Sequence, residues 1–128
     1  SFAKLFPTLI AGSFYPQFST LPKPKLKKED VRELISSMRY YNSGEGFLND
    51  LDQELDKEAL RLIKCPTLIL HSAHDASVSV DHPQHAKANI HQADMRMIAN
   101  TWGHLLWVST EAEPMIAEVI HFMEHKDQ

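Results

Sequence analysis

The first 28 residues show no regular spacing of hydrophobic and polar positions. Prolines at positions 7, 16, 22 and 24 interrupt any helical or strand period. Aromatic side chains are scattered among them, at Phe2, Phe6, Phe14, Tyr15 and Phe18. This pattern favours an irregular arm, residues 1–28, that lies on the surface of the folded part.

From residue 29 the spacing becomes helical. Val31, Leu34, Ile35 and Met38 recur at i, i+3, i+4 and i+7, which places them on one face of a helix. Glycines near position 44 are expected to end it. Two shorter amphipathic stretches, at 47–55 and 59–63, follow. We therefore predict a helical segment over residues 29–62.

The pattern changes again at Pro66. Residues 67–70 form an uncharged run that is typical of a strand covered on both faces, as in a parallel sheet. A helix is expected from Asp81 to about residue 90, and a second strand at 95–99. A last helix follows Pro114, with its apolar face formed by Ile116, Val119, Ile120 and Met123. The order strand, helix, strand, helix predicts an α/β fold.

Composition narrows the class of protein. A chain of 128 residues is the length of one average domain, and its net charge of −4 argues against a nucleic-acid binder. No run approaches the ~20 apolar residues that a membrane span needs. The single cysteine, Cys65, excludes an internal disulfide and makes a reducing, cytoplasmic setting the simplest expectation. Cys65 precedes the first strand, and we expect it to be a small buried side chain.

Two ionisable residues follow the predicted strands at similar distances. Asp75 lies five residues beyond the first uncharged run, and His104 lies five residues beyond residue 99. The carboxyl ends of parallel strands meet at one edge of a sheet, so the two loops are expected to be neighbours. A carboxylate placed there can fix the tautomer of an imidazole and stabilise its protonated form. We predict that Asp75 and His104 lie within hydrogen-bonding distance.

The same region resembles a known family. Residues 63–72, with Asp75 and Val78 after them and His82 opening a helix, resemble the acid-bearing segment of the α/β-hydrolase fold. Gly103-His104, followed by an acidic loop and an amphipathic helix, is similar to the histidine segment of that family, and 29 positions separate acid from histidine. The resemblance implies a C-terminal α/β-hydrolase segment at 63–128, preceded by a cap-like or lid-like helical segment at 29–62. It also implies catalytic roles for Asp75 and His104 in a nucleophile–His–Asp triad that hydrolyses an ester or a related bond in a small molecule.

The departures from the family pattern concern the nucleophile. The family carries it on a G-x-S-x-G elbow ahead of the acid. The chain has no such motif, and Ser13 stands in Ala-Gly-Ser-Phe-Tyr, with one glycine in the wrong place. We therefore expect the chain, which does not begin with Met, to be the C-terminal half of such an enzyme. Alone it should be inactive and should either pair with the missing N-terminal half or self-associate. The alternative is a non-catalytic binding or interaction module derived from the fold.

Other residues could suggest different chemistry. Eight histidines include the pairs His71/His74, His82/His85 and His121/His125, but no H-E-x-x-H motif joins any of them. We expect solvated surface histidines, a packing role for His71, and neither a metal nor another cofactor. Trp102, which neighbours His104, is equally consistent with lining a substrate pocket and with packing in the core.

Overall fold

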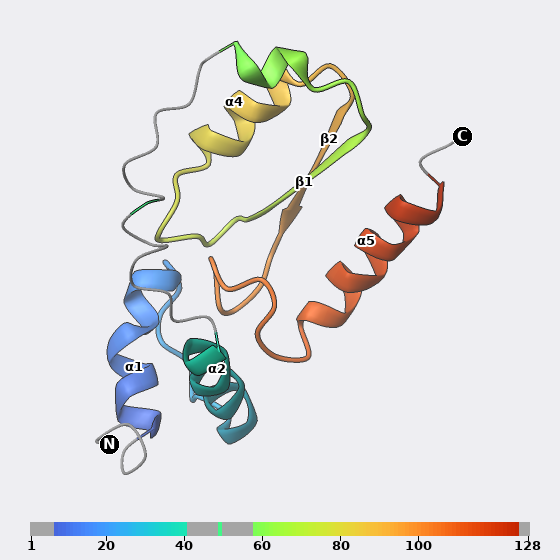
Figure 1. Cartoon of the computed structure of the whole chain (residues 1–128). Coiled ribbons are helices and arrows are strands. Elements are labelled where there is room, and N and C mark those ends of the chain that lie inside the picture. The colour runs from blue at the N-terminus through green and yellow to red at the C-terminus, as the bar shows by residue number, and fades with distance from the viewer. Residues whose placement is uncertain (1–6, 41–48, 50–57, 126–128) are drawn as a thin grey trace.

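The computed structural model describes residues 7–40, 49 and 58–125. At its centre lie two parallel strands, β1 (Thr67–Ser72) and β2 (Ala93–Ile98), as Figure 1 shows. Thr67 lies opposite Ala93 and Ser72 lies opposite Ile98, with no offset along the ladder. The predicted α/β fold is confirmed, and each predicted strand differs from the observed one by at most two residues at either end.

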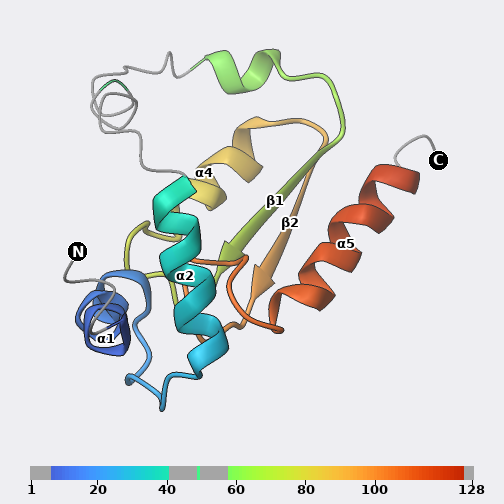
Figure 2. The same ribbon diagram turned by 60° about the horizontal axis from the view of Figure 1, so that its bottom comes forward.

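One helix lies on each side of this sheet. Helix α4 (Asp81–Asn89) connects the two strands, and helix α5 (Ala112–His125) follows β2. Both views place α4 and α5 on opposite sides of the strands (Figures 1 and 2). The sequence predicted both helices: α4 from Asp81 and the early Pro83, and α5 from its apolar spacing and Pro114.

The remaining described elements belong to the N-terminal part of the chain. Helices α1 (Pro7–Phe18) and α2 (Lys28–Tyr40) lie beyond the carboxyl ends of the strands, and the short 3-10 helix η2 (Ala59–Leu62) precedes β1. The end predicted for the helix near position 44, and the stretch 47–55, lie outside the described residues. None of the described helices is long and apolar enough to cross a membrane.

Helix α1 occupies 12 residues of the arm that was expected to be irregular over residues 1–28. Pro7 stands at the first helical position, where a missing N–H removes no hydrogen bond. Pro16 lies inside the last turn of the helix, where its missing N–H removes a hydrogen bond only near the end. Pro22 and Pro24 lie beyond the helix, and the buried residues Ala11 and Tyr15 share a face at i, i+4.

The main buried cluster lies between α1, α2 and the loop that follows β2. Its members are the buried side chains of both helices and of that loop: Ala11, Tyr15, Val31, Leu34, Trp102 and Val108. The rings of Tyr15 and Trp102 meet edge to face, with their centroids 5.6 Å apart. The core therefore packs directly against the carboxyl end of the sheet, where the two loops lie.

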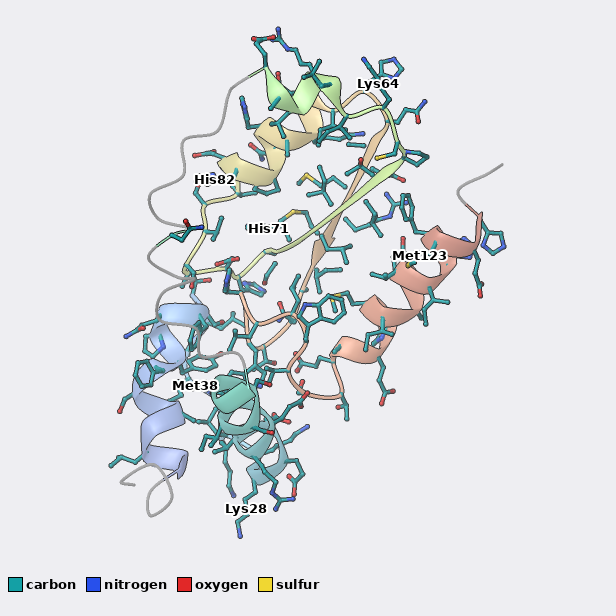
Figure 3. All side chains as sticks on the ribbon, in the orientation of Figure 1. Lys28, Met38, Lys64, His71, His82 and Met123 are labelled. Atoms are coloured by element: carbon teal, nitrogen blue, oxygen red, sulfur yellow. The ribbon has the colours of Figure 1, made fainter. Side chains whose placement is uncertain are left out.

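Two apolar surfaces are partly open among the described residues. Residues 67–70 of β1 are only half-buried, and the strand becomes buried at His71 and Ser72. Ile120 and Met123 of α5 are 50% and 62% exposed. Figure 3 shows Met123 on α5 and Met38 near the end of α2. The Met38 side chain is also exposed. The full covering expected for 67–70 is not reached within the described residues, where β1 also pairs with a strand on one edge only.

Candidate active site

The loops that leave β1 and β2 bring the predicted acid and histidine together. The strands are parallel and in register, so their carboxyl ends coincide and their loops start side by side. His104 Nδ1 lies 2.9 Å from Asp75 Oδ2. The Asp75 side chain is 5% exposed, whereas that of His104 is 42% exposed. A buried carboxylate thus contacts an imidazole that solvent can reach.

The second oxygen of Asp75 is held by its own loop. Asp75 Oδ1 accepts hydrogen bonds from the backbone N–H groups of Ser77, at 2.7 Å, and Val78, at 2.8 Å. This arrangement is an Asx turn, a common use of aspartate in loops. Here it also fixes the direction of the carboxylate, because only Oδ2 remains to meet the histidine.

The environment of Asp75 keeps it ionised. Burial alone raises the pKa of this carboxyl. The hydrogen bonds from Val78, His104 and Ser77 together outweigh burial, and the net pKa of Asp75 lies below its usual value of 3.8. An ionised carboxylate can only accept, so Nδ1 of His104 must carry the proton in this contact. The opposite nitrogen, Nε2, is then available to take up a proton.

A second histidine lies beside the same carboxylate. His71 is buried, as the sequence predicted, and its Nδ1 lies 3.9 Å from Asp75 Oδ2. That separation is too long for a hydrogen bond. His71 is therefore a buried neighbour of the acid, and His104 is the histidine that is hydrogen-bonded to it.

A polar pair that sequence reasoning missed joins the bases of the two loops. Ser72, the last residue of β1, donates from Oγ to Asn100 Oδ1 at 2.7 Å. Asn100 Nδ2 donates to the carbonyl of Gly103 at 3.0 Å, and the backbone N–H of His74 donates to Ser72 Oγ at 3.0 Å. Both side chains are buried. Their sequence signal is position alone: Ser72 ends β1 three residues before Asp75, and Asn100 lies two residues beyond β2 and four before His104.

The loop that carries His104 requires a glycine. Gly103 has φ of +56°, and a Cβ atom added there would lie 2.2 Å from the carbonyl oxygen of Phe18. Both the backbone conformation and the space therefore exclude a side chain. Trp102, on the other side of Gly103, is 1% exposed and belongs to the core, so the packing alternative holds for it.

Other candidates considered from the sequence lie elsewhere. Cys65 is exposed, so the expectation that it is buried is wrong; it lies in the bend before β1, outside the paired strand. His121 and His125 both lie on α5, and their ring centroids are 4.2 Å apart with the ring planes tilted by 32°. Among the described residues, no group of three or more potential ligands is arranged to hold a metal ion.

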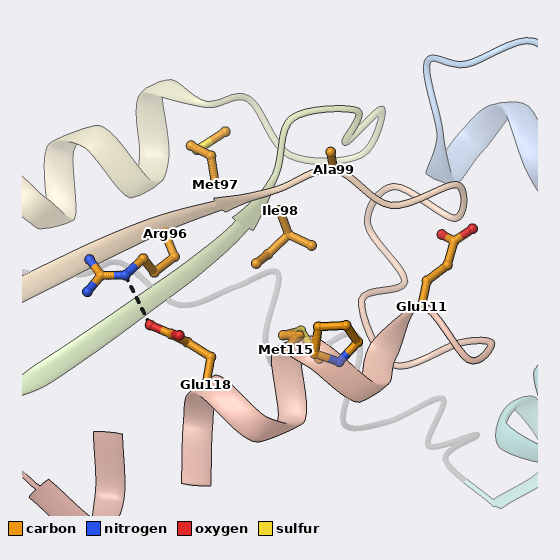
Figure 4. Close-up of a pocket in the computed structure, with 8 residues that line it drawn as sticks. Arg96, Met97, Ile98, Ala99, Glu111, Met115 and Glu118 are labelled. Atoms are coloured by element: carbon orange, nitrogen blue, oxygen red, sulfur yellow. Dashed lines mark hydrogen bonds and ion pairs between the residues drawn. The ribbon is translucent and has the colours of Figure 1, made fainter. Parts of the chain in front are cut away.

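A separate cavity of about 340 Å³ lies between β2 and α5 (Figure 4). Arg96 and Ile98 point into it from the strand, and Arg96 Nε lies 3.0 Å from Glu118 Oε1 on α5. Neither Asp75 nor His104 lines this cavity. It belongs to the half-open contact between sheet and helix rather than to the site.

Comparison with known proteins gives one named relative. The chain is 38% identical over 125 residues to a protein of Bacillus subtilis (strain 168) named uncharacterized hydrolase YcgS. The match covers 93% of this chain and 44% of that protein, so the chain spans less than half the length of its relative. No family model matches the chain, and no solved structure matches it.

Proposed function

We propose that this chain is part of a hydrolase and that Asp75 and His104 are the acid and base of its catalytic triad. The observation that carries the proposal is the 2.9 Å contact between an ionised, buried carboxylate and a solvent-accessible imidazole. The printed name of the relative, a hydrolase, supports the same reaction class. In this proposal residues 63–128 belong to an α/β-hydrolase-type sheet and residues 29–62 to its cap.

In the proposed mechanism each group has one role. The oxygen of the nucleophile attacks the carbonyl carbon of an ester or related bond, and Nε2 of His104 takes the proton that this oxygen loses. The same proton then passes to the leaving group as the bond to that group breaks, and water repeats the sequence to release the acid. Asp75 remains ionised throughout and holds the imidazolium by charge and hydrogen bond.

The nucleophile is proposed to come from outside these residues. The chain contains no G-x-S-x-G motif. Among the described residues, the hydrogen bond of the His104 ring runs to Asp75, and no serine or cysteine is bonded to Nε2. We expect the 128-residue chain alone not to hydrolyse esters, and a reducing, cytoplasmic location remains part of the proposal.

The test uses the complete product of the gene with a simple aryl ester. His104→Ala should lower kcat by about four to six orders of magnitude, because the general base is lost. His91→Ala is the matched control, since His91 is exposed and precedes the amino end of β2; it should leave kcat unchanged. A His104→Ala enzyme with normal turnover would contradict the proposal. A complete product that binds small molecules without turnover would favour the non-catalytic module instead.

A further inference from the structure

The backbone of residues 17–20, here called the linking segment, lies between the two loops of the site. The carbonyl oxygen of Phe18 accepts hydrogen bonds from the backbone N–H of His104, at 2.8 Å, and from that of Ala76, at 3.2 Å. Ala76 directly follows Asp75. A single oxygen atom therefore holds the backbone of the base and the backbone next to the acid.

The linking segment makes further contacts with the acid loop. The backbone N–H of Thr20 donates to the carbonyl of His74 at 2.9 Å, and together with the bond from Ala76 to Phe18 it forms an antiparallel bridge between Ser19 and Asp75. Ser77 Oγ donates to the carbonyl of Gln17 at 2.6 Å. The loop that carries Asp75 is thus paired with this segment almost as one strand is paired with another.

Tyr15 ties the helix before the segment to the histidine loop. Its hydroxyl donates to the carbonyl of Thr101 at 2.7 Å, and its ring packs on Trp102. Tyr15 is 0% exposed. The space that Gly103 leaves empty is occupied by the Phe18 carbonyl and by Ser19 Cα. The histidine loop therefore contacts α1 through Thr101 and Trp102, and it contacts the linking segment at Gly103.

Burial alone does not fix the orientation of His104. With 42% of its side chain exposed, the imidazole has free space around it. Its position relative to Asp75 depends on where the two backbones are held. A displacement of about 1 Å would lengthen the 2.9 Å contact beyond hydrogen-bonding distance.

We propose that the linking segment, together with Tyr15, positions the Asp75–His104 pair by holding both loops at a fixed separation. These residues touch neither substrate nor nucleophile in this scheme and act only through the pair. The catalytic meaning of the inference rests on the proposed function. The positioning itself is a property of this chain and can be measured without turnover.

The test compares two hydroxyl deletions on the same helix. Tyr15→Phe removes the hydrogen bond to Thr101 and keeps the ring. Ser13→Ala is the matched control, because the Ser13 hydroxyl donates within α1, to Leu9, and reaches neither loop. Ser77→Ala, at an exposed position, is a second variant that removes the contact with Gln17 without disturbing the core.

The readout is the tautomer of His104 at neutral pH, taken from the ¹⁵N chemical shifts of its ring nitrogens in the 128-residue chain. A carboxylate acceptor at Nδ1 holds the proton on that nitrogen, whereas a loosened ring reverts toward a mixture of tautomers. We expect Tyr15→Phe and Ser77→Ala to lower the Nδ1–H fraction and Ser13→Ala to leave it unchanged. In the complete enzyme, the same two variants should lower kcat about tenfold with KM unchanged.

Each result has a distinct meaning. Unchanged tautomers in both Tyr15→Phe and Ser77→Ala would overturn the positioning role while leaving the proposed function intact. A mixture of tautomers in the unsubstituted chain would overturn the Asp75–His104 pair itself, and the proposed function with it. A normal pair combined with a complete enzyme that lacks all hydrolysis would leave the positioning supported and the proposed function contradicted.

Discussion

Asp75 illustrates how a few hydrogen bonds determine the charge of one side chain. Its burial favours the neutral acid, yet two backbone N–H groups and one imidazole hold it ionised. The ionised form in turn dictates that Nδ1 of His104 is the protonated nitrogen. The proposed base therefore inherits its tautomer from the geometry of a short turn, residues 75–78.

Replacing Asp75 by Asn should reverse that tautomer. The amide oxygen can keep the bonds to Ser77 and Val78, which leaves the amide N–H₂ facing His104. Nδ1 must then accept, the proton moves to Nε2, and the base can no longer take a proton from the nucleophile. Steady-state kinetics of the complete enzyme should show kcat lowered about 10⁴-fold. Near-normal kcat in Asp75→Asn would show that His104 does not depend on this carboxylate.

The lowered pKa of Asp75 also predicts a dependence of stability on pH. Because the folded pKa lies below 3.8, ionised Asp75 contributes its full stability above about that pH. The contribution is lost as the pH falls through the folded pKa. Urea unfolding of the chain and of Asp75→Asn, between about pH 5 and pH 2, should give a difference in free energy that shrinks as the pH falls. A constant difference over this range would contradict the assignment.

At the residue scale, sequence reasoning found the groups with distinctive chemistry and missed those without it. Asp75 and His104 each stand five residues beyond a predicted strand, 67–70 and 95–99, and that spacing predicted their meeting. Ser72 and Asn100 are common polar residues whose pairing depends on the register of the strands. Phe18 contacts both loops through its backbone carbonyl, which every residue has, so the sequence gives no signal for these hydrogen bonds.

At the element scale, the helices and strands divide by the strength of their local signals. The elements after Pro66 carry local signals: an uncharged run for β1, early prolines for α4 and α5, and apolar spacing for α5. Helix α1 lacks such signals, because Pro7 and Pro16 both lie within it and its apolar residues lie on several faces, with Leu9 65% exposed. Its stability comes from Tyr15 and Ala11 packing against distant elements, which local spacing does not reveal.

Helix α2 offers a test of which predicted apolar positions carry stability. Leu34 is 4% exposed in the core cluster, whereas Met38, one turn later on the same face, is 46% exposed. Leu34→Ala should lower the free energy of unfolding by about 2–5 kcal/mol. Met38→Ala, the matched control, should change it by no more than about 0.5 kcal/mol. Urea denaturation measures both, and equal losses would show that the buried face of α2 is not the one described.

At the scale of the whole molecule, the sheet and one helix remain open to association. Within the described residues β1 is paired on a single edge, and α5 exposes Ile116, Ile120 and Met123. Unpaired strand edges and contiguous apolar side chains favour contacts with another chain. Pairing with an N-terminal half, or with a second copy of the chain, would cover this strand edge and this face of α5.

The isolated chain is therefore expected to self-associate at micromolar concentration. Ile120→Lys, on the open face of α5, should weaken association about tenfold, because it replaces buried apolar area at the contact with a charge. Leu62→Lys is the matched control, since Leu62 is 74% exposed on η2, away from α5. Sedimentation velocity over a concentration series distinguishes the cases. A stable monomer at all concentrations would contradict the prediction.

The long-range hydrogen bonds of residues 15–20 also have a consequence for the order of folding. The hydrogen bond from Tyr15 to Thr101 spans 86 residues, and that from Ser77 to Gln17 spans 60. Contacts so distant in sequence require the closure of long loops, so they form slowly and late compared with the helices. During synthesis, residues 15–20 leave the ribosome well before the histidine loop that they hold. The acid and the base are only 29 residues apart, so they can meet before residues 15–20 fix the separation of their loops.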